Sequence, residues 1–143
     1  MPRSHRSASR PPLAPADYAL LSDFRYALRN FIAFSEDAAT ALGLTPQQHQ
    51  AMLAVKGAGG SLYVGQIAER LHIKPHSAAE LVSRLERQGL AERLPDAEDG
   101  RRVSVVLTGQ AEHLLAELSA AHLEELRAIR PLLQRLLDRT GAA

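Results

Sequence analysis

The segment Val64–Thr108, VGQIAERLHIKPHSAAELVSRLERQGLAERLPDAEDGRRVSVVLT, decides the fold. Its apolar spacing predicts a helix over Val64–Leu71, a tight turn, and a second helix over Lys74–Gln88 that Gly89 stops. Two strands then follow as a hairpin, over Leu90–Leu94 and Arg102–Leu107. This order of parts is a winged helix-turn-helix, in which the second helix fits the DNA major groove and the hairpin, or wing, reaches the neighbouring groove.

The second helix divides into an apolar face and a polar face. At 100° per residue, Ala78, Leu81, Val82 and Leu85 fall on one side and are predicted to face the core. Pro75 stands where the helix begins, so free backbone N–H groups remain there for a phosphate oxygen. The residues predicted to contact DNA from this helix are Lys74, Pro75, His76, Ser77, Glu80, Ser83, Arg84 and Arg87.

The tip of the hairpin carries the second group of candidate DNA contacts. The sequence Asp96-Ala-Glu-Asp99-Gly-Arg101-Arg102 places two guanidinium groups on a projecting turn, and a narrow minor groove attracts inserted arginine. Asp99 is predicted to hold Arg101 in a fixed pose, so Asp99, Arg101 and Arg102 are the wing site residues. A lone turn of this kind would be read as a solvated β-turn; its attachment to the helix pair favours a wing.

Long helical segments flank this motif. Residues 1–16 are rich in proline and arginine and are predicted to be a disordered basic arm. Asp17–Leu42 is predicted to be one helix, ended by Gly43, and the aromatic stripe in it is interpreted first as ordinary core. A capping box of Thr45 and Gln48 starts the next helix, which runs to about Lys56, and Ser61–Tyr63 is predicted to be a short strand. Thr108 is predicted to cap a final helix that Pro131 interrupts.

Composition narrows the class of protein. The chain has 143 residues, 45% of them hydrophobic, and no cysteine, which excludes disulfides and thiolate metal sites. The apolar runs are too short to span a bilayer and the N-terminus lacks a signal-peptide core, so a cytoplasmic location is expected. The net charge of +1 is low for a nucleic-acid binder, and residues 64–107 contain seven basic and seven acidic side chains. DNA affinity must therefore come from the placement of charges and from doubling the site in a dimer.

Val64–Thr108 resembles the MarR family of transcriptional regulators, and the likeness extends from about Asp17 to the C-terminus. The pattern VGQIAERL, then LVSRLERQGL, then a wing with Asp96, Asp99 and Arg101 carries the resemblance. The resemblance implies a mainly α-helical winged helix-turn-helix with a small β-hairpin wing and long N- and C-terminal dimerisation helices. The implied division is an arm at 1–16, dimerisation helices at 17–44 and 108–143, and a DNA-binding lobe at 45–107. Two positions depart from the family pattern, Glu98 in the wing and His72 in the turn; histidine tolerates a positive φ.

The function that this resemblance implies is sequence-specific binding to a palindromic double-stranded operator as a homodimeric repressor. A small aromatic or anionic effector would relieve repression, and the residues predicted to line its pocket are Tyr26, Phe31, Phe34 and Tyr63. The histidines are scattered, without the spacing of a metal site or a catalytic motif, so no enzyme activity, metal, cofactor or membrane partner is expected. The alternative is a winged-helix protein-interaction module without DNA binding.

Overall fold

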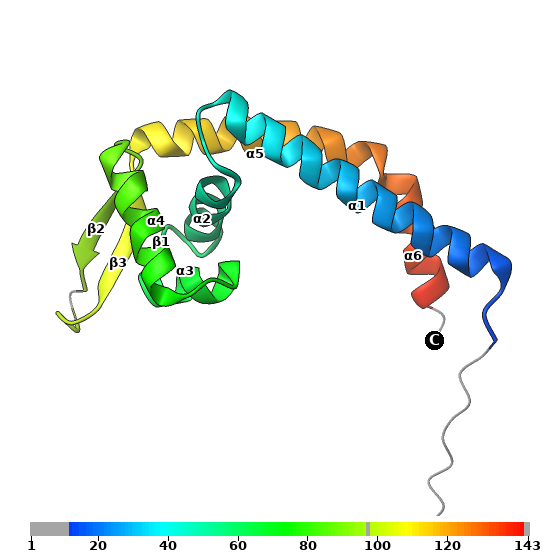
Figure 1. Cartoon of the computed structure of the whole chain (residues 1–143), viewed down its shortest axis with the longest axis horizontal. Coiled ribbons are helices and arrows are strands. Elements are labelled where there is room, and N and C mark those ends of the chain that lie inside the picture. The colour runs from blue at the N-terminus through cyan, green and yellow to red at the C-terminus, as the bar shows by residue number, and fades with distance from the viewer. Residues whose placement is uncertain (1–11, 97, 142–143) are drawn as a thin grey trace, which may run out of the picture.

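The protein consists of a winged-helix lobe attached to one end of a long helical arm (Figure 1). The computed structural model describes residues 12–96 and 98–141. Its elements are α1 (Pro15–Ala41), α2 (Pro46–Gly57), β1 (Ser61–Tyr63), α3 (Val64–Leu71), α4 (Pro75–Arg87), β2 (Ala91–Pro95), β3 (Val103–Leu107), α5 (Gly109–Ala128) and α6 (Arg130–Thr140). We call α2–α4 with the three strands the lobe, and α1, α5 and α6 the arm. In the arm, α1 and α5 run side by side in opposite directions, and α6 turns away at the far end (Figure 1).

Local sequence signals set most helix ends. The predicted capping box is present: the Thr45 side chain accepts from the Gln48 backbone N–H at 3.1 Å, and the Gln48 side chain accepts from the Thr45 N–H at 2.9 Å. Thr108 caps α5 by accepting from the backbone N–H of Ala111 at 3.3 Å. The predicted break before Pro131 is confirmed, since α5 ends at Ala128 and α6 starts at Arg130.

The turn between α3 and α4 depends on His72. Its φ of 53° and ψ of 44° place it in the left-handed region, which histidine adopts more readily than most residues. Its backbone N–H bonds to Glu69 O, and the next N–H, from Ile73, bonds back to Ala68 O at 3.0 Å. This left-handed residue closes α3 and lets the chain enter α4 after two residues, because it redirects the backbone without leaving carbonyls unpaired.

The sheet has the order β1-β3-β2, with both pairs antiparallel. The predicted position of the Val-rich strand between other elements is confirmed: β3 is central, and Val105 is fully buried opposite Leu62 and Arg93. The predicted strand bounds were one residue early at each start. Leu90 lies instead in the turn that closes α4, where its N–H bonds to Leu85 O across Gly89, which has a φ of 72°.

The core lies in the lobe and the first half of α5. The predicted inward face of α4 is confirmed, with Ala78, Leu81, Val82 and Leu85 all buried. The largest fully buried side chains are Met52, Val55, Ile67, Val82, Leu85 and Val105. Burying a side chain of this size contributes roughly 1.5–3 kcal/mol, so this cluster fixes α3 and α4 to the sheet.

The arm leaves much apolar surface uncovered. The interpretation of the aromatic stripe in α1 as ordinary core is wrong for a single chain, because Tyr18 and Tyr26 are exposed and the phenylalanines Phe24, Phe31 and Phe34 are only half-buried. The large exposed apolar side chains of the arm helices are Tyr18, Leu21, Tyr26, Leu28, Ile32, Leu123 and Leu137. No helix in the described ranges is long and apolar enough to cross a membrane.

One ion pair joins α1 to α6 at the end of the arm far from the lobe. Arg139 on α6 donates to both carboxylate oxygens of Asp17 on α1, at 2.5 and 3.1 Å, and Asp17 also accepts from the Ala14 N–H at 2.8 Å. The Arg139 guanidinium, helped by that N–H, lowers the pKa of Asp17 from 3.8 to about 2. The predicted arm at 1–16 must be shortened, because Pro15 already belongs to α1; residues 1–11 lie outside the described residues.

We expect Asp17→Asn to lower the melting temperature near pH 7 and to lower it much less near pH 2. Because the folded-state pKa lies below the unfolded value of 3.8, the carboxylate stabilises the fold above about pH 4. That stabilisation is lost as the pH falls through about 2. Thermal unfolding followed by circular dichroism at both pH values measures the difference.

The matched control is Asp138→Asn on α6, where the carboxylate accepts from Gln134 on the exposed surface. This control should change the melting temperature little at either pH. A gap between wild type and Asp17→Asn that is as large at pH 2 as at pH 7 would contradict the assignment.

Candidate nucleic-acid interface and ligand cavity

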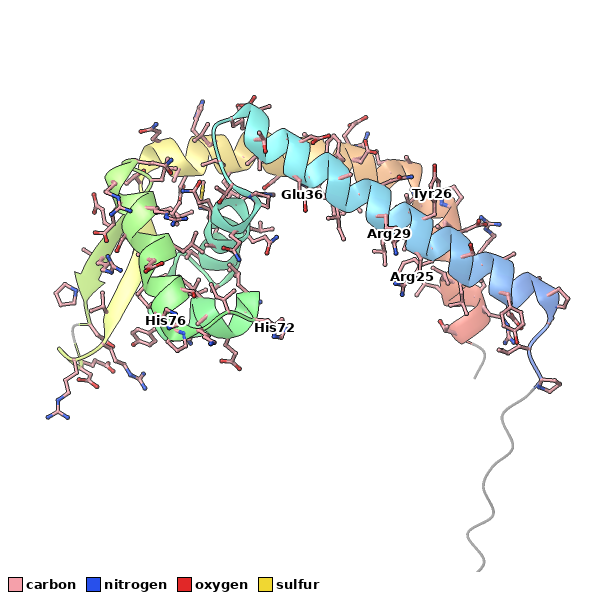
Figure 2. All side chains as sticks on the ribbon, in the orientation of Figure 1. Arg25, Tyr26, Arg29, Glu36, His72 and His76 are labelled. Carbon is pink, nitrogen blue, oxygen red and sulfur yellow. The ribbon has the colours of Figure 1, made fainter. Side chains whose placement is uncertain are left out.

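The polar face of α4 is exposed over its whole length. His76, Glu80, Arg84 and Arg87 are on this face, while Ser77 beside it is half-buried. Lys74 is the N-cap residue and makes no side-chain cap hydrogen bond, so the first backbone N–H groups of α4 are not capped by it. Figure 2 shows His76 and His72 along the lower edge of the lobe, where α3 and the start of α4 lie. An exposed helix start with adjacent cationic side chains is suited to binding a phosphate oxygen.

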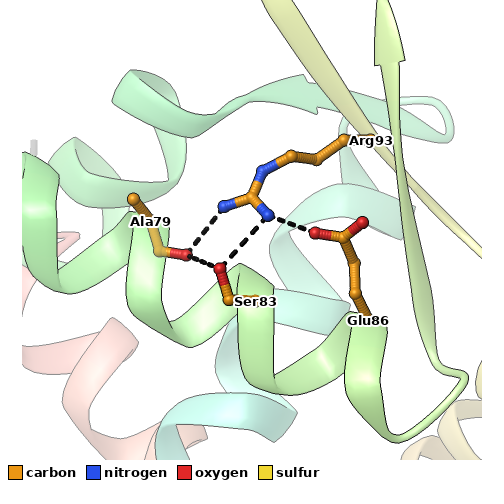
Figure 3. A network of polar contacts seen from close by, with 4 residues as sticks. All are labelled: Ala79, Ser83, Glu86 and Arg93. Carbon is orange, nitrogen blue, oxygen red and sulfur yellow. Dashed lines mark hydrogen bonds and ion pairs between the residues drawn. The ribbon is translucent and has the colours of Figure 1, made fainter.

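Ser83 has a different role from the one predicted. Its hydroxyl donates to the Ala79 carbonyl oxygen at 3.0 Å and accepts from Arg93 Nη1 at 3.2 Å. Arg93 lies on β2, and its Nη2 donates to the same Ala79 oxygen at 2.8 Å while its Nη1 forms an ion pair with Glu86 (Figure 3). We call these contacts the Arg93 clamp. Because the Ser83 hydroxyl is already hydrogen-bonded to Ala79 and Arg93, we remove Ser83 from the proposed DNA contacts.

The clamp joins α4 to the wing. A guanidinium holds several acceptors in one plane, so three contacts from one side chain restrict both the rotation of α4 and its distance from β2. Sequence reasoning missed this contact, because Arg93 occupies an ordinary strand position ten residues after Ser83.

The turn of the wing is ordered by its two aspartates. Asp96 Oδ1 accepts from the Glu98 N–H, and Asp99 Oδ1 accepts from the Arg101 N–H, each at 3.0 Å. Asp99 was predicted to hold the Arg101 side chain; instead it binds the Arg101 backbone. The carboxylate therefore shapes the turn, and the exposed Arg101 side chain projects from a fixed backbone.

Tyr63 supports the wing from β1. Its hydroxyl donates to Asp96 Oδ2, and the Arg102 guanidinium lies 4.9 Å from the centre of its ring. The hydrogen bond from Tyr63 lowers the pKa of Asp96, and the same bond raises the pKa of Tyr63. A cation over a tyrosine ring is held in position, so Arg102 is oriented by Tyr63 while Arg101 is not.

The four predicted pocket residues do not meet. Tyr63 stands at the base of the wing, and Tyr26 is 69% exposed on the arm, away from the lobe (Figure 2). Phe31 and Phe34 do lie together, with both rings packed edge-to-face on His122, at centroid distances of 5.6 and 5.3 Å. Tyr26 and Tyr63 are therefore removed from the pocket, because one belongs to the outer face of α1 and the other to the wing. Phe34 packs on His122 but does not line the cavity described next, so Phe31 alone of the four keeps its predicted place.

A cavity of about 490 Å³ opens where α1 and α5 of the arm meet α2 of the lobe. Its size falls in the range of small-molecule sites, and most of its wall is apolar. The apolar lining residues are Phe31, Ile32, Pro46, Leu53, Leu123 and Leu126. The polar lining residues come from all three helices. They are Ser35, Glu36, His49, Gln50, Ser119 and His122.

Two histidines meet in this cavity. The ring centroids of His49 and His122 are 4.9 Å apart, and burial, followed by the neighbouring His122, lowers the pKa of His49. His122 Nδ1 lies 2.5 Å from Leu118 O, and its Nε2 lies 2.7 Å from Ser35 Oγ. Sequence reasoning treated these histidines as scattered, because Ser35, His49 and His122 come from three separate helices. In the described part of the chain, no group of three potential ligands could hold a metal ion.

These features define a winged-helix protein with a helical arm and a cavity at their junction. Residues 42–102 match the model of the MarR family. The chain is 33% identical over 78 residues to the HTH-type transcriptional repressor MdtR of Bacillus subtilis (strain 168), covering 54% of this chain and 50% of that protein. The match thus spans half the length of that relative.

Two solved structures have the same fold. NadR in complex with 4-hydroxyphenylacetate is 25% identical, with a TM-score of 0.67 over 92% of each chain. A mutant of S. aureus MepR bound to an oligodeoxyribonucleotide is 21% identical, with a TM-score of 0.65 over 87% of this chain and 93% of that one. Over residues 42–102 the chain is thus similar to the MarR family.

We expect Arg93→Lys to destabilise the protein by about 1 kcal/mol, because lysine keeps the charge but cannot make all the contacts of the clamp. Urea unfolding measures the difference. The control is Arg84→Lys, an exposed position on the polar face of the same helix, which should unfold like the wild type. Equal unfolding midpoints for the two variants would show that the clamp does not hold α4.

Proposed function

We propose that this chain is a sequence-specific DNA-binding transcriptional regulator, a non-enzymatic homodimeric repressor whose hold on DNA a small ligand relieves. The observation that carries the proposal is the exposed polar face of α4 beside a wing that is braced against the same helix. The match of residues 42–102 to the MarR family model supports it, as do the similarity to the repressor MdtR and the likeness to the oligonucleotide-bound MepR structure.

In this proposal α4 enters the major groove. Lys74, Pro75, His76 and Ser77 lie at the start of the helix, where the exposed backbone N–H groups approach a phosphate. Glu80, Arg84 and Arg87 continue the exposed face toward the base edges and the opposite strand. Ser77 and Arg84 flank the centre of this face and are the proposed readers of sequence.

The wing would supply arginine to the adjacent minor groove. Arg101 projects from a turn whose backbone Asp99 fixes, so the backbone of the wing loses little conformational freedom on insertion. Arg102, held over Tyr63, would contact phosphates beside the groove. The near-neutral lobe is consistent with this arrangement, because the positive groups of the wing and of α4 lie on the surface that would face DNA.

Dimerisation would occur through the arm. A single chain exposes Leu21, Ile32, Leu123 and Leu137, more large apolar side chains than a monomeric arm is expected to leave uncovered. Two-fold pairing of the arms would place two α4 helices on successive turns of one DNA face, roughly 34 Å apart, and would require a palindromic operator.

The cavity offers a route for ligand control. It is walled by α1 and α5 of the arm and by α2 of the lobe, so an occupant would change how the lobe is held against the arm. The spacing of the two α4 helices depends on that angle. A ligand that binds better to the spacing unsuited to DNA would release the operator. The NadR complex with 4-hydroxyphenylacetate supports a small aromatic or anionic effector.

We expect Arg101→Ala to weaken operator binding by more than tenfold without unfolding the protein, because it removes the side chain that enters the minor groove. Fluorescence anisotropy with a labelled operator measures the affinity. The control is Lys56→Ala, which also removes one positive charge but at a residue paired with Glu112 on another surface. Equal affinities for the two variants would remove the wing from the mechanism.

The same titration over a series of salt concentrations separates the two candidate functions. A DNA-binding regulator must lose affinity steeply as salt rises, because phosphate contacts release counterions. The alternative is a protein-interaction module, and the equal numbers of acidic and basic residues in 64–107 support it. Absence of duplex binding even at low salt would establish that alternative against our proposal.

We expect Ser77→Ala and Arg84→Ala to change the preferred sequence, and Arg102→Ala to lower affinity for all sequences alike. The reason is that the first two side chains lie on the face of α4 that meets base edges, whereas Arg102 would meet phosphates. Selection from random duplexes, followed by sequencing, measures the preference of each variant. The same consensus for all three variants would refute this division of roles.

A further inference from the structure

The two acidic side chains of α4 differ in their contacts. Glu86 forms an ion pair with Arg93, whereas the ion pairs within the described residues include none to the Glu80 carboxylate. Glu80 is exposed in the middle of α4, on the polar face that is proposed to enter the major groove. A molecule that binds to this face therefore meets a carboxylate at its centre.

Arg84 follows Glu80 by one turn on the same face. Glutamate four residues before arginine is the spacing of a helix-surface ion pair, yet the described part of the chain has no such pair between them. Both side chains line a surface hollow of about 420 Å³. The Ser83 hydroxyl and the Ala79 carbonyl beside them are already bonded to Arg93. The groups that α4 offers at its centre are thus one carboxylate and one guanidinium.

A carboxylate on a DNA-binding face restricts the bases that can lie opposite it. The phosphates repel it, so it lowers affinity for every sequence unless a base edge donates a hydrogen bond to it. The major groove presents two such donors, the N4 amino group of cytosine and the N6 amino group of adenine. Adenine N6 stands between two acceptors, its own N7 and the O4 of the paired thymine, and both repel a carboxylate. Cytosine N4 has an acceptor on one side only, the O6 of the paired guanine, so the Glu80 carboxylate fits cytosine best.

The position of Arg84 sets where a second base is read. Four residues advance about 6 Å along a helix, and stacked base pairs are about 3.4 Å apart. A guanidinium donates two hydrogen bonds to the O6 and N7 of guanine, which is the commonest specific contact of arginine in the major groove. Arg84 would therefore reach a guanine one or two base pairs away from the base that faces Glu80.

We propose that Glu80 is a specificity-determining residue that accepts a hydrogen bond from N4 of a cytosine, so that each operator half-site contains a C·G pair at that position. A guanine read by Arg84 lies one or two base pairs from it. The inference rests on the proposed DNA-binding function and names the base edge that the centre of α4 recognises. The carboxylate contributes by rejecting the other three bases, whose edges oppose it with acceptors.

The test compares full-length wild type with Glu80→Gln in a selection from random duplexes, followed by sequencing. Glutamine has the same size, but its amide can accept from N6 and donate to N7 of one adenine. We expect a C·G pair in each half-site for the wild type. For Glu80→Gln, adenine should replace cytosine at that pair, and the guanine assigned to Arg84 should stay.

The control is Glu92→Gln, which also removes one negative charge from an exposed position in the lobe. Arg93, the next residue of β2, reaches α4, so strand alternation directs Glu92 to the opposite face of the sheet. This variant should select the wild-type consensus. Thermal unfolding of all three proteins should coincide, because both substituted side chains are exposed.

Fluorescence anisotropy then measures the size of the effect on defined duplexes. One duplex carries the selected sequence, and the second carries A·T in place of the C·G pair of one half-site. Wild type should bind the second duplex about tenfold more weakly, because the carboxylate then faces two acceptors. Glu80→Gln should bind the second duplex at least as tightly as the first.

The outcomes separate the role of Glu80 from DNA binding itself. A wild-type consensus without a C·G pair in each half-site, or the same consensus for wild type and Glu80→Gln, would overturn the proposal. Tighter binding of Glu80→Gln to both duplexes by the same factor would also overturn it, since the carboxylate would then only repel phosphates. A wild type that selects no duplex would instead overturn the DNA-binding function on which the inference rests.

Discussion

The fixed angle between α4 and the wing is the constraint on which the proposed function depends. Both would have to reach DNA together, so neither can be allowed to rotate separately. The buried side of α4 packs on the core of the lobe, and Arg93 reaches from β2 to a polar side of the helix. The left-handed backbone at His72 sets where α4 begins, and Tyr63 with Asp96 sets where the wing ends. The core packing of α4, the contacts of Arg93, and the turns at His72 and Asp96 thus hold α4 and the wing together as one rigid unit.

The arm holds the unit of α4 and the wing in place, and a second copy of the chain or a bound ligand could change its position. Its helices leave apolar surface exposed, and they also form two of the three walls of the cavity. Dimerisation and ligand binding would therefore share the same helices, and a change at the cavity would be felt where the lobe joins the arm. The bidentate contact between Asp17 and Arg139 keeps the far end of the arm closed, away from this junction.

Local signals were enough to predict the elements of the lobe. The bounds of α3, the buried face of α4 and the Thr45–Gln48 capping box depend on residues within a few positions of each other, so periodicity and capping chemistry reveal them. The contact between Ser35 and His122 joins residues 87 positions apart, and nothing in either segment marks the other. The Arg93 clamp is closer in sequence, but it required knowing the face of β2 on which Arg93 lies. Ser83 was misassigned for that reason.

Amide chemical shifts of the isotope-labelled protein, recorded while a selected duplex is added, test the central claim most directly. If α4 and the wing contact DNA as one unit, the largest changes will fall in residues 74–87 and 98–102. Both groups will change together at the same duplex concentration. Changes confined to the arm helices, or an α4 whose shifts do not move while the duplex is bound, would contradict the account.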